Sequence, residues 1–170
     1  MFGWIKRLGR KKAVQQHAYW DQETRLVQNP EALRIQRISD LKYAIFTAKR
    51  QKKKHSHLAA ELARLEQEVG AEVLNKAADL LKKPGAWTRG AYARDAAGQI
   101  VTSTDHTATC WCVMGATIRA AFSLGVRPGD ALEQIAKFAG GNIGAWNDAP
   151  GRTQAEVVAA LRQAAKDSTQ

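Results

Sequence analysis

Two cysteines and one histidine are the residues whose types and spacing could support covalent or metal chemistry. Cys112 is expected near a helix N-terminus, where a thiol has a lowered pKa and can act as a nucleophile. The base available to it is His106, but both lie on one short segment, whereas a Cys–His pair normally comes from separate elements. A zinc site built from His106, Cys110 and Cys112 would lack a fourth ligand and the usual Cys spacing. We therefore expect no catalytic residue, no metal site and no cofactor, and we interpret Cys112 beside Trp111 as a buried thiol.

The positive charge of the chain is concentrated in its first third. The 170 residues carry a net charge of +10. Residues 1–57 contain 14 Lys and Arg against 4 Asp and Glu, whereas residues 58–170 contain 12 of each kind. Such a basic arm suits an anionic partner, although it could also be a solvated surface that keeps the protein soluble. The residues predicted to bind the anion form two groups along the chain. The first is Lys6, Arg7, Arg10, Lys11 and Lys12, and the second is Lys49, Arg50, Lys52, Lys53 and Lys54.

Phosphate is the anion that the second of these two groups suits best, because each neutralised phosphate strengthens binding in a salt-dependent way. The predicted partners are nucleic acid or another anionic surface, together with other protein chains in an oligomer or larger assembly. A membrane surface is a weaker alternative: Trp4, Ile5 and Leu8 suit one face of a short basic helix, but Gly3 and Gly9 weaken it. The chain has no zinc-finger spacing and no helix-turn-helix or RNA-binding signature that would indicate base-specific reading.

The elements that must position the basic residues are helical. Asn29-Pro30-Glu31 predicts a helix start, and apolar residues then recur at three- and four-residue steps up to Val73, with Phe46 on the apolar side. A single helix of roughly 40 residues, near 60 Å long, and a helical hairpin turning at the basic cluster are both compatible with this pattern. We favour the single helix, paired like a coiled coil, because hairpin turns usually carry Gly, Asn or Pro and none is present. Gly70 is expected to separate it from a second helix at residues 71–82.

The rest of the chain predicts a compact module. Extended runs at 87–94 and 99–102, around a turn at 95–98, predict a β-hairpin near 87–102 that packs through Trp87 and Tyr92. Helices are expected at 106–122, with Phe122 inward, at 130–139 and at 154–166, the last with a Thr153–Glu156 capping box. The predicted fold class is mainly α with one small β-hairpin: a long basic N-terminal helical arm over residues 1–69, then a compact α+β module over 70–170.

Seven residues are expected to hold this module together: Trp87, Tyr92, Trp111, Cys112, Trp146, Asn147 and Asp148. Residues 140–153 are expected to form a loop in which Trp146 packs on the core. Asn147 and Asp148 are expected to accept hydrogen bonds from backbone N–H groups where the final helix starts. Arg152 is expected to pair with one of the Asp residues.

Three segments of the module carry a resemblance. They read WTRGAYARDAAG at 87–98, CWCVMGA at 110–116 and WNDAPGRT at 146–153. Together they resemble an uncharacterised family of small bacterial and bacteriophage proteins, a domain of unknown function marked by a WC pair and a WND pair. The resemblance covers about residues 70–166, implies a phage or prophage setting, and supplies no reaction.

The sequence therefore predicts a non-enzymatic interaction or structural protein of a phage or prophage. Its basic arm would bind nucleic acid or an acidic protein surface within an assembly such as a virion. One alternative is a free cytoplasmic nucleic-acid-binding regulator, and a second is an enzyme of unknown reaction that uses Cys112 or loop Asp residues. The expected location is cytoplasmic or virion-associated, because no run of 18 apolar residues and no secretory signal are found.

Overall fold

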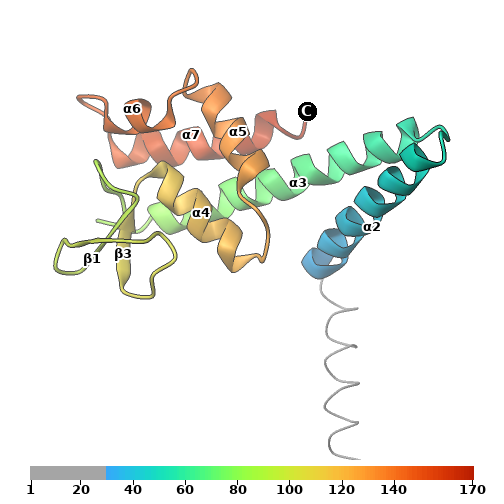
Figure 1. Cartoon of the computed structure of the whole chain (residues 1–170). Coiled ribbons are helices and arrows are strands. Elements are labelled where there is room, and N and C mark those ends of the chain that lie inside the picture. Colours follow the sequence, from blue (N-terminus) through green and yellow to red (C-terminus); the bar gives the residue numbers. More distant parts are fainter. Residues whose placement is uncertain (1–29) are drawn as a thin grey trace, which may run out of the picture.

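The computed structural model describes residues 30–170, and Figure 1 shows their arrangement. The elements in chain order are α2 (Pro30–Arg50), α3 (Ser56–Leu81), β1 (Ala93–Asp95), β2 (Ile100–Val101), β3 (Ala108–Trp111), α4 (Val113–Ser123), α5 (Gly129–Phe138), α6 (Ile143–Asp148) and α7 (Gln154–Asp167). The predicted fold class is confirmed: the described chain is mainly helical, with one small antiparallel sheet. None of its helices within residues 30–170 is long and apolar enough to cross a membrane.

Helix α3 is the element around which the core is built. Its C-terminal half packs against α4, α5 and α7 through a buried face that includes Leu74, Ala77 and Leu81. Helix α7 contributes Val157 and Leu161 to the same core. Many of the buried residues are alanines, which allow helices to approach one another closely. The capping box at the start of α7 is confirmed, because the Thr153 side chain and the Glu156 side chain each accept from the other's backbone N–H.

The sheet contains a strand that the sequence pattern did not predict. The expected turn forms at 95–98, where Asp95 Oδ1 accepts from the backbone N–H of Ala97 at 2.9 Å and of Gln99 at 2.8 Å. Beyond this hairpin, β3 pairs with the other edge of β1, in the order β2-β1-β3. The prediction of a helix from residue 106 is therefore wrong. Residues 108–111 are extended because they are hydrogen-bonded to β1, and α4 starts only at Val113.

Cys112 and Gly115 form the start of α4. Cys112 is the N-cap residue, and its Sγ accepts from the Gly115 N–H at 3.4 Å. A Cβ atom at position 115 would collide with the carbonyl oxygen of Tyr92, so the segment before β1 lies directly against the helix at this glycine. The same carbonyl accepts from the Cys112 N–H at 3.2 Å. Tyr92 is held by its backbone while its side chain is half exposed, and the prediction that its ring packs inward is wrong.

Helices α2 and α3 form a hairpin, so the preference for one continuous helix is wrong. Helix α2 ends in a Schellman motif: the Lys53 N–H donates to the carbonyl of Ala48, and the Lys52 N–H donates to that of Lys49. Lys52 has a φ of 53°, the conformation that glycine usually supplies at this place. The turn therefore exists without the Gly, Asn or Pro that hairpin turns usually carry.

Helix α3 also runs through Gly70 without a break, so the expected separation of two helices there is wrong. Gly70 is buried, and a Cβ at this position would meet the amide of Gln134 on α5, so the glycine allows close packing between the two helices. The assignment of residues 1–69 and 70–170 to two domains stays a prediction.

Two further expectations concern the end of the module. The loop predicted at 140–153 contains the short helix α6, whose N-cap Asn142 accepts from the Ala145 N–H at 2.9 Å. Phe122 is exposed on α4, so its predicted inward position is wrong.

Candidate functional site

The basic cluster predicted from the sequence lies at the connection between α2 and α3, and we call residues 49–54 the basic turn. Its five cations are the second group predicted to bind an anion: Lys49, Arg50, Lys52, Lys53 and Lys54. All five are exposed. Figure 1 shows the turn at the end of the molecule away from the sheet. The structure thus presents these charges together at the tip of a helical hairpin.

Acidic residues do not neutralise the basic turn within the part of the chain that the structure describes. Residues 41–60 contain six Lys and Arg and no Asp or Glu. The ion pairs between α2 and α3 lie nearer the module: Arg34–Glu72 at 2.7 Å, Arg37–Glu61 at 2.8 Å and Lys42–Glu66 at 2.8 Å. These pairs engage the carboxylates of α3 that face α2, and none of them includes a cation of the basic turn. The first predicted group, Lys6, Arg7, Arg10, Lys11 and Lys12, lies outside the described residues.

Two exposed aromatic side chains lie next to the basic turn. The sequence pattern did not predict that they would be exposed. Tyr43 is 73% exposed and Phe46, which was expected on the apolar side, is 57% exposed. The residue of α2 that is buried against α3 is Leu41. The Arg50 guanidinium lies 5.8 Å from the centroid of the Phe46 ring. The spacing of Phe46 and Arg50, four residues apart on a helix, is the signal that could have indicated this contact.

In the module, the side chain of Asn147 joins the three segments that carry the family resemblance. It is 1% exposed. Its Oδ1 accepts from Trp87 Nε1 at 2.8 Å and from the Val113 N–H at 3.1 Å. Its Nδ2 donates to the carbonyl of Thr88 at 3.2 Å and to Asp148 Oδ1 at 2.7 Å. The buried amide therefore connects α6 to the segment before β1 and to the first residue of α4.

The contacts of Asn147, Asp148 and Arg152 differ from those predicted for these three side chains. Both carboxylate oxygens of Asp148 lie 3.2 Å from the Gly90 N–H, so Asp148 and Asn147 hold the segment before β1 and not the start of the final helix. Arg152 does not pair with an Asp residue within residues 30–170. Its guanidinium stacks 4.1 Å from the centroid of the Trp146 ring, and its Nε donates to the Trp146 carbonyl at 3.1 Å.

Cys112 lines a small cavity of about 220 Å³ next to this cluster, together with Gly90, Tyr92, Met114 and Asp148 among others. Burial raises the pKa of the Cys112 thiol, and the nearby Asp148 carboxylate raises it further. The N–H groups of Gly115 and Met114 act in the opposite direction but do not outweigh burial. The expectation of a lowered thiol pKa is therefore wrong, and at neutral pH the side chain is a thiol rather than a nucleophilic thiolate.

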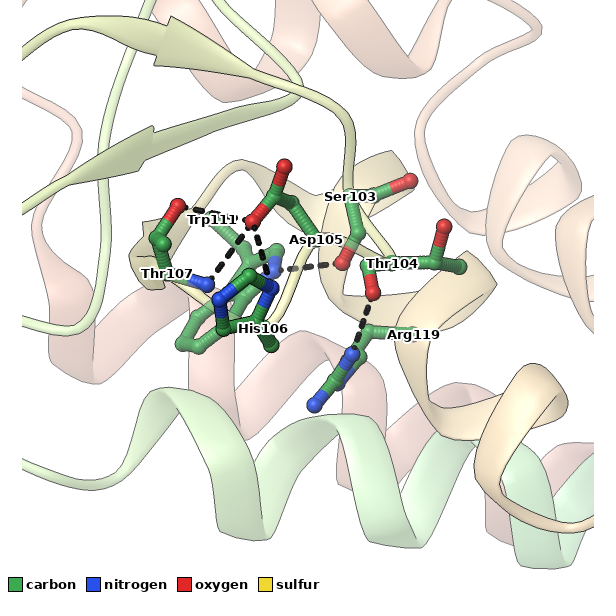
Figure 2. A network of polar contacts seen from close by, with 7 residues as sticks. All are labelled: Ser103, Thr104, Asp105, His106, Thr107, Trp111 and Arg119. Atoms are coloured by element: carbon green, nitrogen blue, oxygen red, sulfur yellow. Dashed lines mark hydrogen bonds and ion pairs between the residues drawn. The ribbon is translucent and has the colours of Figure 1, made fainter.

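His106 lies in the turn between β2 and β3, which a separate polar network holds (Figure 2). Asp105 Oδ1 accepts from Thr107, from the N–H at 2.8 Å and from the hydroxyl at 2.7 Å, and these bonds lower the pKa of the Asp105 carboxyl. His106 Nδ1 is 3.5 Å from the same carboxylate, and the imidazole is almost fully exposed. The Nε1 of buried Trp111 donates to the Ser103 carbonyl at 2.9 Å. His106 is thus a turn residue and does not line the cavity beside Cys112.

Comparison with known proteins assigns a family to the module, and the matched range does not include the basic turn. No curated protein and no solved structure matches the chain. A family model described as a family of unknown function matches residues 65–167, a range that includes all three segments joined by Asn147 and excludes the basic turn. Because the match covers more than half of the 170 residues, the chain belongs to the family of unknown function DUF6197.

Proposed function

We propose that this protein is a non-enzymatic interaction protein whose basic turn binds nucleic acid. The observation that carries the proposal is the concentration of five exposed Lys and Arg in six residues, without an acidic partner among residues 30–170. Their mutual repulsion is relieved when an anion or salt neutralises them. A polyanion with closely spaced phosphates does this with the additional gain of counterion release.

The setting proposed for this binding is a phage or prophage assembly such as a virion. It rests on the resemblance of the WC and WND segments to small bacterial and bacteriophage proteins. The basic residues between Lys6 and Lys12 carry charge of the same sign and would add to the attraction for a polyanion. A free cytoplasmic regulator would use the same basic turn, and the two settings differ in whether other protein chains bind the module.

An enzyme that uses Cys112 is less well supported. Burial raises the pKa of its thiol, so the side chain is protonated at neutral pH. Asp148 accepts from Asn147 and Gly90, which accounts for its position without a substrate.

The test is the salt dependence of nucleic-acid binding by the full chain, measured by fluorescence anisotropy with a labelled oligonucleotide. The variant replaces the five cations: K49Q, R50Q, K52N, K53Q and K54Q. Asn is chosen at position 52 because it tolerates the positive φ of Lys52. The slope of log K against log salt should become shallower by about 0.7–0.9 for each phosphate that the variant no longer neutralises.

A smaller matched pair controls for net charge. The variant K53Q/K54Q removes two charges from the basic turn, and K82Q/K83Q removes two exposed charges from the end of α3. Only the first pair should weaken binding. A full chain that ignores oligonucleotides at low salt, or a five-cation variant that binds as tightly as the original, would show the proposal to be wrong.

A further inference from the structure

We infer that the nucleic acid bound by the basic turn is single-stranded, with bases stacked on Tyr43 and Phe46. This inference rests on the proposed function and specifies its ligand. The residues that carry it lie in one continuous stretch, from Tyr43 on the last turns of α2 to Lys54 in the basic turn.

The two rings face solvent, on the side of α2 that α3 does not cover. Tyr43 is the most exposed of the large hydrophobic residues in the described chain, at 73%, and Phe46 is 57% exposed. Residues three apart on a helix are surface neighbours, with Cβ atoms about 5–6 Å apart. Arg50 follows at the next turn and lies against the Phe46 ring. Two aromatic rings on neighbouring turns are therefore followed along the helix by the cations of the basic turn.

A pair of exposed rings next to a run of cations matches the chemistry of an unpaired strand. Each nucleotide presents a flat base and a charged phosphate, and single-strand binding sites combine aromatic platforms with a basic track. In a duplex the base faces are covered by their neighbours, so phosphate contacts would explain the cations but leave the exposed rings without a role. The pairing of rings with cations therefore favours the single strand.

The same surface does not suit a membrane. An interfacial helix gathers its apolar residues on one face. The apolar residues of α2 are instead distributed around it, with Leu41 buried against α3 and Leu33, Tyr43 and Phe46 exposed. Between Leu33 and Tyr43 the exposed residues include Ser39 and Asp40. The stretch that remains apolar and basic is the short one next to the turn.

The experiment compares an oligo-dT strand with a duplex of equal length, using the full chain and fluorescence anisotropy. We expect tighter binding to the single strand. Y43A and F46A should each weaken single-strand binding by about ten-fold, the contribution of one stacked base. Because neither change removes a charge, the salt slope should stay as it is, whereas K53Q/K54Q should reduce it. Y43F and F46W keep an aromatic face and should retain the affinity.

Two other exposed residues serve as matched controls. Leu33, on the same helix, is 50% exposed, and Phe122, on α4 in the neutral module, is 65% exposed. L33A and F122A should leave binding unchanged. All four side chains are exposed, so circular dichroism should show that each variant stays folded.

Each remaining outcome overturns the inference in a distinguishable way. Equal or tighter duplex binding with no effect of Y43A or F46A would remove the single-strand assignment and leave the proposed function intact. Binding to vesicles of anionic lipid, or to polyglutamate, but not to oligonucleotides would assign the surface to a membrane or an acidic protein. No binding to any of these probes would contradict both the inference and the proposed function.

Discussion

Asn147 shows what a single residue contributes to this module. Its buried amide makes four hydrogen bonds, to Trp87, Val113, Thr88 and Asp148. A carboxylate could not donate to the Thr88 carbonyl, and an apolar residue could accept from neither N–H. The chemistry of the amide therefore accounts for an Asn between Trp146 and Asp148 in the WND segment.

We predict that N147A destabilises the protein by about 3 kcal/mol, because two donors, the half-buried Trp87 Nε1 and the buried Val113 N–H, lose their acceptor. The measurement is urea denaturation followed by circular dichroism. N142A is the control: Asn142 is an exposed N-cap, and its loss should cost about 1 kcal/mol. Equal effects of the two substitutions would show that the Asn147 contacts contribute little.

Cys112 is predicted to react slowly with iodoacetamide at neutral pH. Burial raises its thiol pKa in the folded state, so the native chain holds this proton more tightly than the unfolded chain does. The stability contributed by this group is therefore present at neutral pH and is lost as pH rises through the raised pKa. In a C110S variant, mass spectrometry should show slower alkylation of folded than of urea-unfolded protein. A folded rate at or above the unfolded rate would contradict the raised pKa.

At the scale of elements, α4 and the segment before β1 are joined through backbone contact. The Cys112 N–H and the α-carbon of Gly115 both lie against the Tyr92 carbonyl. Any side chain at position 115 would push apart the sheet and the helix that it leads into.

The substitution G115A is predicted to destabilise the protein by about 3 kcal/mol, at the upper end of overpacking costs, because the atom it meets is backbone and cannot rotate away. G129A is the matched control. Gly129 begins α5 with no heavy atom near its missing Cβ, so the change should be neutral or stabilising by up to about 1 kcal/mol. The free energies of unfolding in urea provide the comparison, and a neutral G115A would mean that the sheet and helix can move apart freely.

The turn between α2 and α3 contains a residue with a left-handed backbone conformation. Lys52 is the non-glycine residue with positive φ in the described chain, a conformation that costs an L-residue about 1–2 kcal/mol. K52G should therefore raise the thermal midpoint, by about 2–4 °C for each kcal/mol gained. K53G removes the same charge at a position without positive φ and should lower the midpoint. A decrease for both variants would show that Lys52 is not strained.

At the scale of the whole molecule, α3 connects the charged tip to the neutral module. Its 26 residues span about 39 Å, with α2 beside the N-terminal part and α4, α5 and α7 around the C-terminal part. The family match begins at residue 65, inside this helix. The module therefore supports the basic turn through one continuous helix, which holds the charges away from the sheet as Figure 1 shows.

The features that the sequence alone predicted correctly are local. The capping box of Thr153 and Glu156, the turn at Asp95–Gly98 and the presence of helices α5 and α7 each depend on residues within a few positions of one another. The charge difference between the two parts of the chain is likewise a property of composition. Such features follow from the sequence because their energies depend on neighbours along the chain.

Tertiary contact decided the rest. Residues 108–111 are extended because they pair with β1, and α4 begins later than its apolar period suggests. The contacts between α2 and α3, which are the buried side chain of Leu41 and three ion pairs, require the chain to reverse direction after α2. Lys52 adopts a glycine-like conformation at this reversal. The cation cluster could be read from the sequence, but its place at a hairpin tip beside Tyr43 and Phe46 could not, because exposure depends on which helix face a distant segment covers.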